Sequence, residues 1–298
     1  MIISCYKGDK TLPLVLQQIK NQSYKKFEVI IVDDGSPTDL SSVIISAKPN
    51  FRIRFVKQLR QKGRSYTRNT GIMLSEGSSI IFTDQDIIFD SNFILRFAIR
   101  QYYTSRCVFI GFKEDIEFED LVNSEKARLE SDWRYLVKGE KFFIPLYFDK
   151  KLPTNPERIY KILEETNNFK NFGFGKTIGF WNLASMVISH GLCLKRKQAV
   201  KIGGFPEQGF SGWGAQDIAF GAKLIGEGNF IIPVLNNTYF HINHERYSGS
   251  RKKEMVELKE NLKSYFKLLK SEEYNSQPEK RKIKKTRCLG NIEFFEID

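Results

Sequence analysis

The sequence lacks any apolar run approaching the ~18 residues that a membrane-spanning helix needs. Its four cysteines are widely scattered and form neither a disulfide nor a metal-binding pattern, so we expect reduced thiols in a cytosolic protein. The first residues carry no basic stretch followed by a long apolar core, and we therefore expect no secretory signal. These absences favour a protein that folds around an ordinary hydrophobic core.

What is present is a globular composition with an excess of positive charge. The 298 residues are 41% hydrophobic and 28% charged, which suits one large or two ordinary soluble domains. The net charge of +12 is uneven: seven basic residues and no acid lie between Phe51 and Ser75, and six of the eight residues from Lys280 to Arg287 are basic. Such clusters attract phosphates, nucleic acid or anionic lipid, or are simply solvated faces.

Apolar runs and helical spacings alternate along the first 112 residues. Strands are predicted at Ile2–Cys5, Phe27–Val32 and Arg52–Lys57, and within Ser78–Asp86. Helices are predicted at Thr11–Gln22, around Val43–Ala47 and at Gly63–Glu76. Alternation of this kind predicts an α/β fold, with a mostly parallel central sheet flanked by helices, like that of nucleotide-binding (Rossmann-like) proteins.

The later sequence is less regular. A helix at Asn92–Tyr103 and a strand at Cys107–Phe112 precede a charged insertion, Lys113–Lys176. The pattern then predicts a helix after Asp217, a strand at Phe230–Val234 and a long helix with an apolar stripe from Met255 to Leu269. We therefore expect one domain over 1–250, made of a nucleotide-binding half (1–112), the insertion (113–176) and a second half (177–250). A helical, basic extension follows over 251–298.

Pairs of acids stand where two predicted strands end. Asp33 and Asp34 close the second strand, and Asp84 and Asp86 close the fourth with Gln85 between them. Ligands of open α/β sheets bind at this carboxyl edge, and two acids one residue apart are good oxygen ligands for a divalent cation. The alternatives are an acidic loop at Asp84–Asp86 and helix-capping roles for Asp33 or Asp34.

With these motifs in order, the sequence resembles a family 2 glycosyltransferase of the GT-A fold, like the transferase domains of bacterial polysaccharide and chondroitin polymerases and of galactosyltransferases. The resemblance covers roughly residues 1 to 247. It rests on five motifs in the family's order, which are Ser4-Cys5-Tyr6, Val32-Asp33-Asp34-Gly35-Ser36, Thr67-Arg68-Asn69-Thr70-Gly71, Thr83-Asp84-Gln85-Asp86, and Gly203-Gly204-Phe205 followed by Trp213-Gly214-Ala215-Gln216-Asp217.

The resemblance implies a donor site on the first half of the chain. It assigns the recognition of a UDP-sugar to a set of six residues: Asp33, Asp34, Arg64, Arg68, Asp84 and Gln85. In this assignment an aspartate accepts from a nucleobase N–H, and Arg68 binds the diphosphate. Arg64 is a surface charge in the alternative interpretation.

The resemblance also implies the catalytic and acceptor residues. Asp217 resembles the family's catalytic base, and a carboxylate at a helix N-terminus interacts favourably with the helix dipole. Trp213, Gly214 and Gln216 would contact the acceptor, with Trp213 stacking on a sugar face unless it is a core side chain. Many relatives have Glu at the position of Gln216, so this residue puts acceptor recognition in question.

A metal site follows from the same resemblance. Asp86 of the DxD motif would bind Mn²⁺ or Mg²⁺ directly, together with a histidine after the last predicted strand. His241 matches the family's metal ligand, and His244 is the alternative. The metal would neutralise the diphosphate leaving group.

The sequence thus predicts an inverting, metal-dependent glycosyltransferase (a hexosyl- or N-acetylhexosaminyl-transferase) of surface polysaccharide biosynthesis. Its partners would be a UDP-sugar and a glycan or lipid-linked glycan. We expect a cytoplasmic location, with the basic C-terminal region contacting the inner face of the membrane, and no specific binding of nucleic acid.

Two other functions fit parts of the pattern. A nucleotidyltransferase would want a glycine-rich phosphate loop after the first strand, where only Gly8 stands. A non-catalytic protein that binds glycans or nucleic acid through its basic clusters would not need Asp217 and would bind nucleic acid in a salt-sensitive way.

Overall fold

The structure, a computed structural model, describes residues 1–123, 184, 187–243, 250–271 and 292–297. The strands in these ranges form one sheet in the order β5-β8-β6-β7-β4-β1-β2-β3-β9. Their bounds are β1 Ile2–Cys5, β2 Val29–Asp33, β3 Ile53–Gln58, β4 Ser79–Asp84, β5 Ile87–Phe89, β6 Cys107–Glu117, β7 Leu192–Lys195, β8 Phe230–Asn243 and β9 Ile292–Ile297.

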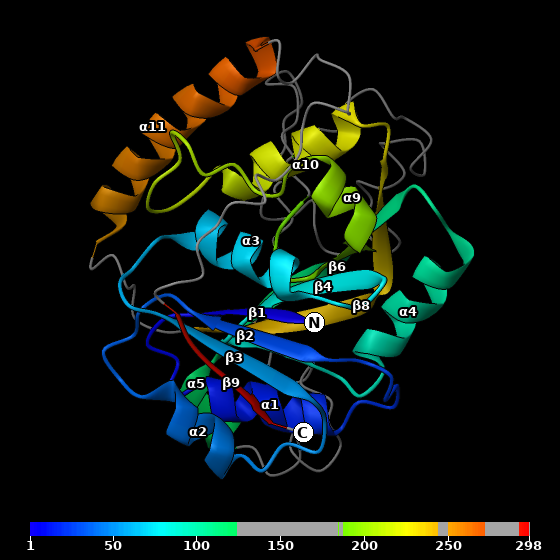
Figure 1. The fold of residues 1–298 in the computed structure, drawn as a ribbon, viewed down its shortest axis with the longest axis vertical. Coiled ribbons are helices and arrows are strands. Elements are labelled where there is room, and N and C mark those ends of the chain that lie inside the picture. The colour runs from blue at the N-terminus through cyan, green and yellow to red at the C-terminus, as the bar shows by residue number, and fades with distance from the viewer. Residues whose placement is uncertain (124–183, 185–186, 244–249, 272–291, 298) are drawn as a thin grey trace.

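Helices cover both faces of this sheet. In the view of Figure 1, α3, α9 and α10 lie above it and α1, α2 and α5 below it, while α11 crosses the top beside α10. The helix bounds are α1 Leu12–Lys20, α2 Leu40–Ser46, α3 Arg64–Leu74, α4 Phe93–Tyr103, α5 Phe118–Asn123, α9 Arg196–Lys201, α10 Gln216–Gly226 and α11 Arg251–Lys270. Among the described residues, none of these helices is both long and apolar enough to cross a membrane.

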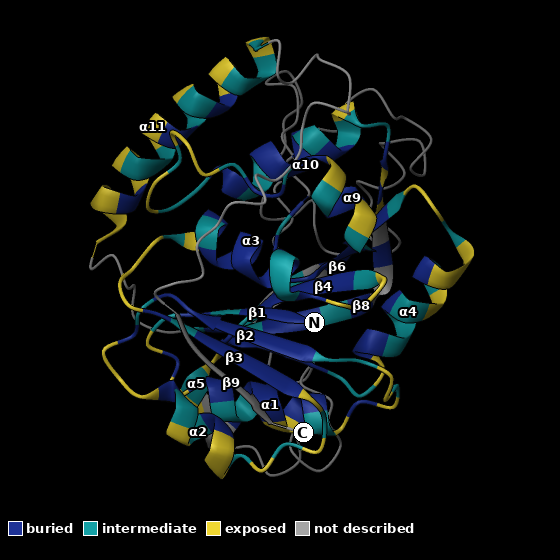
Figure 2. Cartoon of the chain, in the orientation of Figure 1, coloured by how far each residue is buried: buried dark blue, intermediate teal, exposed yellow. Residues whose placement is uncertain are grey.

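The parallel centre of the sheet confirms the α/β fold class. β1 pairs in parallel with β2 and β4, and β2 pairs in parallel with β3. Successive residues face opposite layers: Ile2 and Ile30 belong to the core cluster on one side, whereas Ile3 and Ile31 belong to the cluster on the other. Burial on both faces explains why these strands are continuous apolar runs, drawn dark blue in Figure 2.

Two predicted strands were too short. The strand expected at Cys107–Phe112 runs on to Glu117, so it enters the segment that the sequence assigned to an insertion, and β8 continues past Val234 to Asn243. The charged residues of β6 suggested a loop, but in the sheet they have partners across the β6–β8 pairing, where Asp115 lies opposite His241. The rest of the expected insertion, the basic cluster near the C-terminus and His244 lie outside the described residues.

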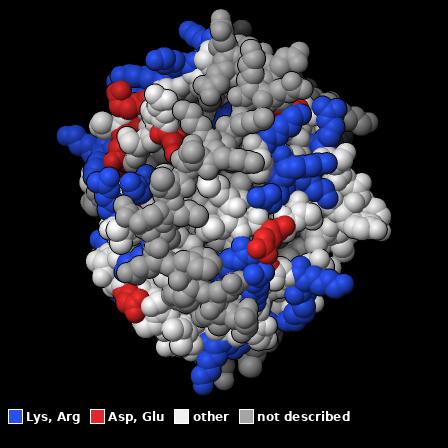
Figure 3. Space-filling view, in the orientation of Figure 1, with Lys and Arg blue, Asp and Glu red and all other residues white. Residues whose placement is uncertain are grey.

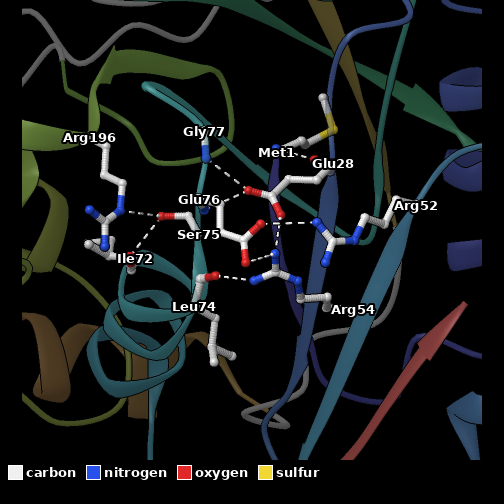
Figure 4. Close-up of polar contacts among 10 residues, drawn as sticks. All are labelled: Met1, Glu28, Arg52, Arg54, Ile72, Leu74, Ser75, Glu76, Gly77 and Arg196. Atoms are coloured by element: carbon white, nitrogen blue, oxygen red, sulfur yellow. Dashed lines mark hydrogen bonds and ion pairs between the residues drawn. The ribbon is translucent and has the colours of Figure 1, made fainter. Parts of the chain in front are cut away.

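An ion-pair network ties the elements together at the amino-terminal edge of the sheet, away from the acidic motifs (Figure 4). Arg54 is buried there, and its Nη2 lies 3.0 Å from Glu28 Oε2 and also contacts Glu76. Its Nη1 donates to the carbonyl of Leu74, and Glu76 also pairs with Arg52 at 3.0 Å. Two of the basic residues that the sequence grouped as a phosphate-attracting cluster therefore join β3 to the α3–β4 connection.

Candidate active site

The acidic motifs meet at the carboxyl edge of the parallel strands, as the sequence predicted. Ser4 of β1 pairs with Asp84 of β4, and Cys5 pairs with Asp33 of β2. The two pairs are one residue apart on the same central strand. Aspartates separated by 51 positions in the chain are thereby placed on neighbouring strands at one end of the sheet.

Asp33 and Asp34 play different parts in the loop that follows β2. Asp34 accepts from the N–H groups of Lys62, at 2.7 Å, and of Gly63, so it anchors the segment that leads into α3. Asp33 accepts from the N–H and hydroxyl of Ser36 through Oδ1, while its buried Oδ2 has no hydrogen-bond partner among the described residues. Burial raises the pKa of both carboxyls, and these hydrogen bonds oppose the rise.

Asp33 Oδ2 is the acceptor that a ligand could still use, because both oxygens of Asp34 are already engaged. A buried acceptor without a partner costs free energy, so a hydrogen bond from a donor such as a nucleobase N–H would be favourable there. The assignment of this residue to donor recognition stays a prediction. Asp34 serves the loop itself.

Arg68 connects the donor side of the site to the expected base. Its guanidinium is buried, with Nη2 3.4 Å from Asp84 Oδ1 and Nη1 3.4 Å from Asp217 Oδ1. The group also lies 5.5 Å from the centre of the Phe205 ring. Burial would lower the pKa of Arg68, but Asp217 and Asp84 outweigh it and the net shift is upward. Three motifs distant in sequence thus share one cation.

Burial raises the pKa of Asp84, and the positive charge of Arg68 opposes that rise. Arg64 also opposes it, which places this exposed residue, the first of α3, within electrostatic reach of the site. A carboxylate held against a buried arginine keeps a fixed position at the end of β4.

Asp217 lies in the first turn of α10 and is partly exposed, so the helix presents its carboxylate towards the site. Ala215, just before the helix, adopts a left-handed conformation (φ 65°) that makes the sharp entry into the helix. Gln216 is buried, and its Nε2 donates to the carbonyl of Gly212 at 3.0 Å. This amide therefore holds the preceding loop; its predicted contact with an acceptor is untested.

Gln85 has a comparable role at the end of β4. Its Oε1 accepts from the N–H of Tyr6 at 2.8 Å and its Nε2 donates to the carbonyl of Tyr6 at 2.7 Å. The amide of Gln85 thus pairs with the main chain of Tyr6, just after β1, as a neighbouring strand would. Gly8 leaves room for it, since a Cβ there would lie 2.3 Å from Gln85 Oε1. The assignment of Gln85 to donor binding stays a prediction.

Asp86 and His241 face each other across two paired strands. His241 of β8 pairs with Ile87 of β5, the residue after Asp86, and its Nε2 lies 3.8 Å from Asp86 Oδ2. On its other side, His241 pairs with Asp115 of β6, and its Nδ1 lies 2.9 Å from Asp115 Oδ1. The histidine is therefore held between two carboxylates, that of Asp86 just before β5 and that of Asp115 on β6.

Asp115 is a residue that the sequence reasoning missed. Burial alone would raise its pKa, but the hydrogen bond with His241 and the charge of Lys113, 2.8 Å away, bring the pKa below its ordinary value. An ionised Asp115 favours the tautomer of His241 in which Nδ1–H donates to it, and Nε2 then lies on the side of Asp86. The sequence predicted that this strand ends at Phe112, so it placed Asp115 in the insertion and gave no sign of a site residue there.

Asn69 belongs to the Thr67–Gly71 motif, and the sequence predicts no role for it. Its Nδ2 donates to the carbonyl of Phe205 at 2.8 Å, and its Oδ1 accepts from the N–H of the same residue at 2.7 Å. Gly204 has a positive φ of 71°, and a Cβ there would lie 2.3 Å from Asn69 Oδ1. Asn69 therefore fastens the glycine turn beside Arg68, which explains why the two motifs occur together.

Trp213 is half-buried at the edge of the site. The Trp213 ring centre lies 5.8 Å from the guanidinium of Arg251. The main-chain N–H of Trp213 donates to the Glu257 carboxylate of α11. Gly214, beside it, has a φ of 96°. Their predicted contacts with an acceptor are not tested by this arrangement.

The residues around His241 fit a divalent cation. Among the described side chains, no cluster of three or more His, Cys, Asp or Glu forms a complete metal-binding set. The chemistry of the pair is nevertheless suitable, because an imidazole oriented by a carboxylate and facing a second carboxylate is a common protein contribution to a metal site. Ligand oxygens and water would complete such a set.

The sequence model described as "Glycosyl transferase family 2" matches residues 1–149 of this chain. The glycosyltransferase GlyG of Streptococcus pneumoniae is 33% identical over 96 residues, which make up 32% of this chain and 32% of that protein. The chain aligns with about a third or less of the length of the first curated relatives it matches.

Solved structures share the fold at low sequence identity. GalNAc-T7, solved with UDP, GalNAc and Mn²⁺, superposes with a TM-score of 0.62 over 92% of this chain and 48% of its own, at 15% identity. The mannosyltransferase PcManGT of Pyrobaculum calidifontis, in complex with GDP-Man and Mn²⁺, gives a TM-score of 0.55 over 89% of this chain and 63% of its own, at 15% identity. The architecture is therefore the GT-A fold.

Proposed function

Because the chain belongs to glycosyl transferase family 2, we propose that it transfers a sugar from a UDP-sugar to a hydroxyl group on a glycan or lipid-linked glycan, with inversion at the sugar carbon. The observation that carries the proposal is the contact of Arg68 with both Asp84 and Asp217. One buried cation there links the end of the donor strand to the expected base.

In the proposed reaction each of these residues has one role. Asp217 takes the proton of the acceptor hydroxyl, whose oxygen forms a bond to C1 of the sugar. The bond between C1 and the diphosphate oxygen breaks, and its electron pair leaves with the nucleotide. Arg68 orients Asp217 and lies beside the carboxylate at the end of β4, where the negative diphosphate would bind.

Asp86 and His241 are the residues that would hold the divalent cation, Mn²⁺ or Mg²⁺, and His244 remains the alternative to His241. When bound, the cation supplies positive charge to the leaving diphosphate. Both solved structures named above contain Mn²⁺, which supports a metal requirement. Asp115 orients His241, and Asp33 offers its unpartnered oxygen to the nucleobase.

The test is a screen of UDP-sugars and GDP-sugars with Mn²⁺, in which chromatography measures the free nucleotide diphosphate. We expect turnover of at least one UDP-sugar and an inverted anomeric configuration in the product, read by NMR. If no nucleotide sugar is consumed, the proposal is wrong. GDP-sugars belong in the screen because a structural neighbour was solved with GDP-Man.

Replacing Asp115 with asparagine is expected to weaken Mn²⁺ binding by about 10–100-fold, because the neutral amide no longer fixes the His241 tautomer. Electron paramagnetic resonance of free Mn²⁺ measures this without any turnover. The matched control is Glu117→Gln: this residue lies two positions on along β6, and its partner is Asn243. Equal Mn²⁺ affinity in the Asp115 variant and the wild type would rule out the orienting role.

The outer face of α11 supports the expected contact with a membrane surface. Its exposed side chains are mainly basic or apolar and include one acid; they are Arg251, Lys252, Lys253, Met255, Val256, Lys259, Glu260, Lys263, Phe266, Lys267 and Lys270. Figure 3 shows basic side chains over the region of α11, with acidic side chains among them. A lysine-rich face with apolar side chains suits the headgroup layer of an anionic bilayer. We propose this peripheral contact as the way the protein reaches a lipid-linked acceptor.

Reversing two of these charges, Lys259→Glu with Lys263→Glu, is expected to weaken binding to phosphatidylglycerol-containing vesicles by roughly 30-fold, since each lysine near such a surface contributes about 1 kcal/mol. Sedimentation with vesicles, at low and high salt, measures the effect. The control pair is Lys25→Glu with Lys26→Glu, two exposed lysines outside α11. Two results would refute this contact. One is equal binding of the wild type to pure phosphatidylcholine vesicles, and the other is an equal loss of binding in the control pair.

A further inference from the structure

The loop that carries Trp213 rests on a helix from outside the segment that the family model matches. Asn261 of α11 is buried, with 1% of its surface exposed. Its Oδ1 accepts from the N–H of Ser211 at 3.0 Å, and its Nδ2 donates to three carbonyls: Ser211 at 2.8 Å, Gly214 at 2.9 Å and Trp213 at 3.2 Å. One amide side chain thus contacts four main-chain groups of the loop, with its two N–H hydrogens shared among three carbonyls.

Glu257, one helical turn before Asn261, adds a second attachment. Its Oε2 accepts from the N–H of Trp213 at 2.8 Å. The loop is partly exposed at these positions, so these hydrogen bonds to α11 hold it in this conformation, and their loss would leave the loop freer to move. The residues that these hydrogen bonds join are 44 to 50 positions apart in sequence.

Two glycines let the loop approach the helix this closely. Gly212 has a φ of 61°, and a Cβ there would lie 2.3 Å from the Glu257 carboxylate. Gly214 has a φ of 96°, and a Cβ there would lie 2.7 Å from the Leu258 side chain. Both positions require a conformation that other residues rarely adopt. The Trp-Gly sequence is therefore shaped to fit α11 as well as to precede α10.

The loop in turn sets the start of α10. Gln216 donates to the carbonyl of Gly212, across the left-handed Ala215, and Asp217 is the next residue. The body of α10 also packs on α11, where Ala219, Ala222 and Tyr265 form a small core cluster. Movement of α11 relative to the loop would move the Asp217 carboxylate away from Arg68.

We propose that Asn261 and Glu257 are positioning residues: α11 holds the Ser211–Gly214 loop so that Trp213 and Asp217 stay in register with the donor side of the site. This inference rests on the proposed function for its effect on turnover. The contacts themselves stand independently of it. The helix thereby belongs to the catalytic unit through its inner face.

The experiment compares Asn261→Ala and Asn261→Asp with the wild type. Hydrogen exchange, followed by mass spectrometry, is expected to show faster exchange of the amides of residues 211–217 in both variants. Asn261→Asp is expected to fail as Asn261→Ala does, because it keeps the acceptor for Ser211 but loses the donors to the three carbonyls. The affinity for UDP with Mn²⁺, measured by calorimetry, is expected to stay unchanged, since the hydrogen bonds of Asn261 go to the Ser211–Gly214 loop and not to the residues proposed to bind UDP and Mn²⁺.

Turnover of the nucleotide sugar identified in the screen is expected to fall at least about tenfold in kcat, because small misplacements of a base are costly, with the KM for that donor unchanged. Glu257→Ala should show the same pattern more weakly, and it replaces the Asn261 variants if these do not fold. The matched control is Glu260→Ala, an exposed glutamate on the same helix that pairs with Lys263.

Unchanged exchange at residues 211–217 in a folded Asn261 or Glu257 variant would overturn the inference. So would equal effects in Glu260→Ala. A wild-type protein that turns over no nucleotide sugar would refute the proposed function, but hydrogen exchange would still decide whether α11 holds the loop.

Discussion

Replacing Asp217 with asparagine is expected to slow sugar transfer by about 10²–10⁴-fold, the usual contribution of a general base. Asparagine keeps the size of the side chain and an oxygen that can accept from Arg68, but it cannot take a proton. We therefore expect the affinity for UDP and Mn²⁺ to change little while kcat falls. Initial rates of nucleotide release, together with calorimetric titration of UDP, separate the two quantities.

The control for this substitution is Asp90→Asn. Asp90 pairs with Arg96 at 2.7 Å, away from the proposed base, so its replacement tests the general effect of removing a carboxylate. Transfer by the Asp217 variant at a rate near that of the wild type would refute the assignment of the base. A fall in UDP affinity that accounts for the whole loss would instead assign Asp217 to donor binding.

Replacing Arg68 with methionine is expected to cost about 3–5 kcal/mol of stability, because it leaves Asp84 and Asp217 without their buried cation. Sugar transfer should also fall, since the base and the donor strand lose their common contact. Urea unfolding gives the free energy change. The matched control is Arg64→Met, an arginine on the same helix that is exposed and should be nearly neutral for stability.

The stability of the Arg68 variant should also depend on pH in a defined direction. Burial already raises the pKa of Asp84, and loss of Arg68 removes the charge that opposes this rise. A carboxyl with a raised pKa binds more protons in the folded state, so stability falls as pH rises from the unfolded value, about 3.9, through the folded value. The deficit relative to the wild type should thus be larger at about pH 7 than at about pH 5. A deficit that is equal at both values would exclude Asp84 as its source.

The central sheet was predictable because its strands are buried on both faces. Ile30 and Ile31 face opposite layers, so every position of β2 had to be apolar and the run was visible in the sequence. The helix α1 was equally clear, since its predicted apolar residues Leu12, Val15 and Leu16 are fully buried. The meeting of Asp33 with Asp84 followed from the parallel order of the strands.

The outer strands were not predictable in the same way. β6 ends in charged residues whose partners come from β8. Asp115 and His241 are 126 positions apart in sequence, and no local pattern around Asp115 predicts that they pair. The basic stretch from Phe51 to Ser75 had the converse problem. Its arginines look alike in sequence, yet Arg54 completes an ion-pair network at one edge of the sheet and Arg68 joins two aspartates at the other. Charge counts do not reveal which partner each cation meets.

Gln85 and Gln216 show why motif positions and contact roles differ. Both occupy motif positions that the resemblance assigned to ligands, yet the side-chain amides of both bind main-chain groups, of Tyr6 and of Gly212. An amide can replace a missing strand or turn partner, a function that no pattern of hydrophobicity records. The main-chain contacts of both amides are findings of the structure, and the assignment of Gln85 to the donor and of Gln216 to the acceptor stays a prediction.

The attachment of the Trp213 loop to α11 has a practical consequence for fragments of this protein. A shortened chain ending at residue 243 would keep each of the motifs used to recognise the family, and annotation by motif would regard it as a whole catalytic domain. Three loop carbonyls would nevertheless lose the amide of Asn261, and the small cluster beneath α10 would lose Tyr265. The unit that must be expressed intact therefore extends at least to residue 270, well beyond the last residue of any motif.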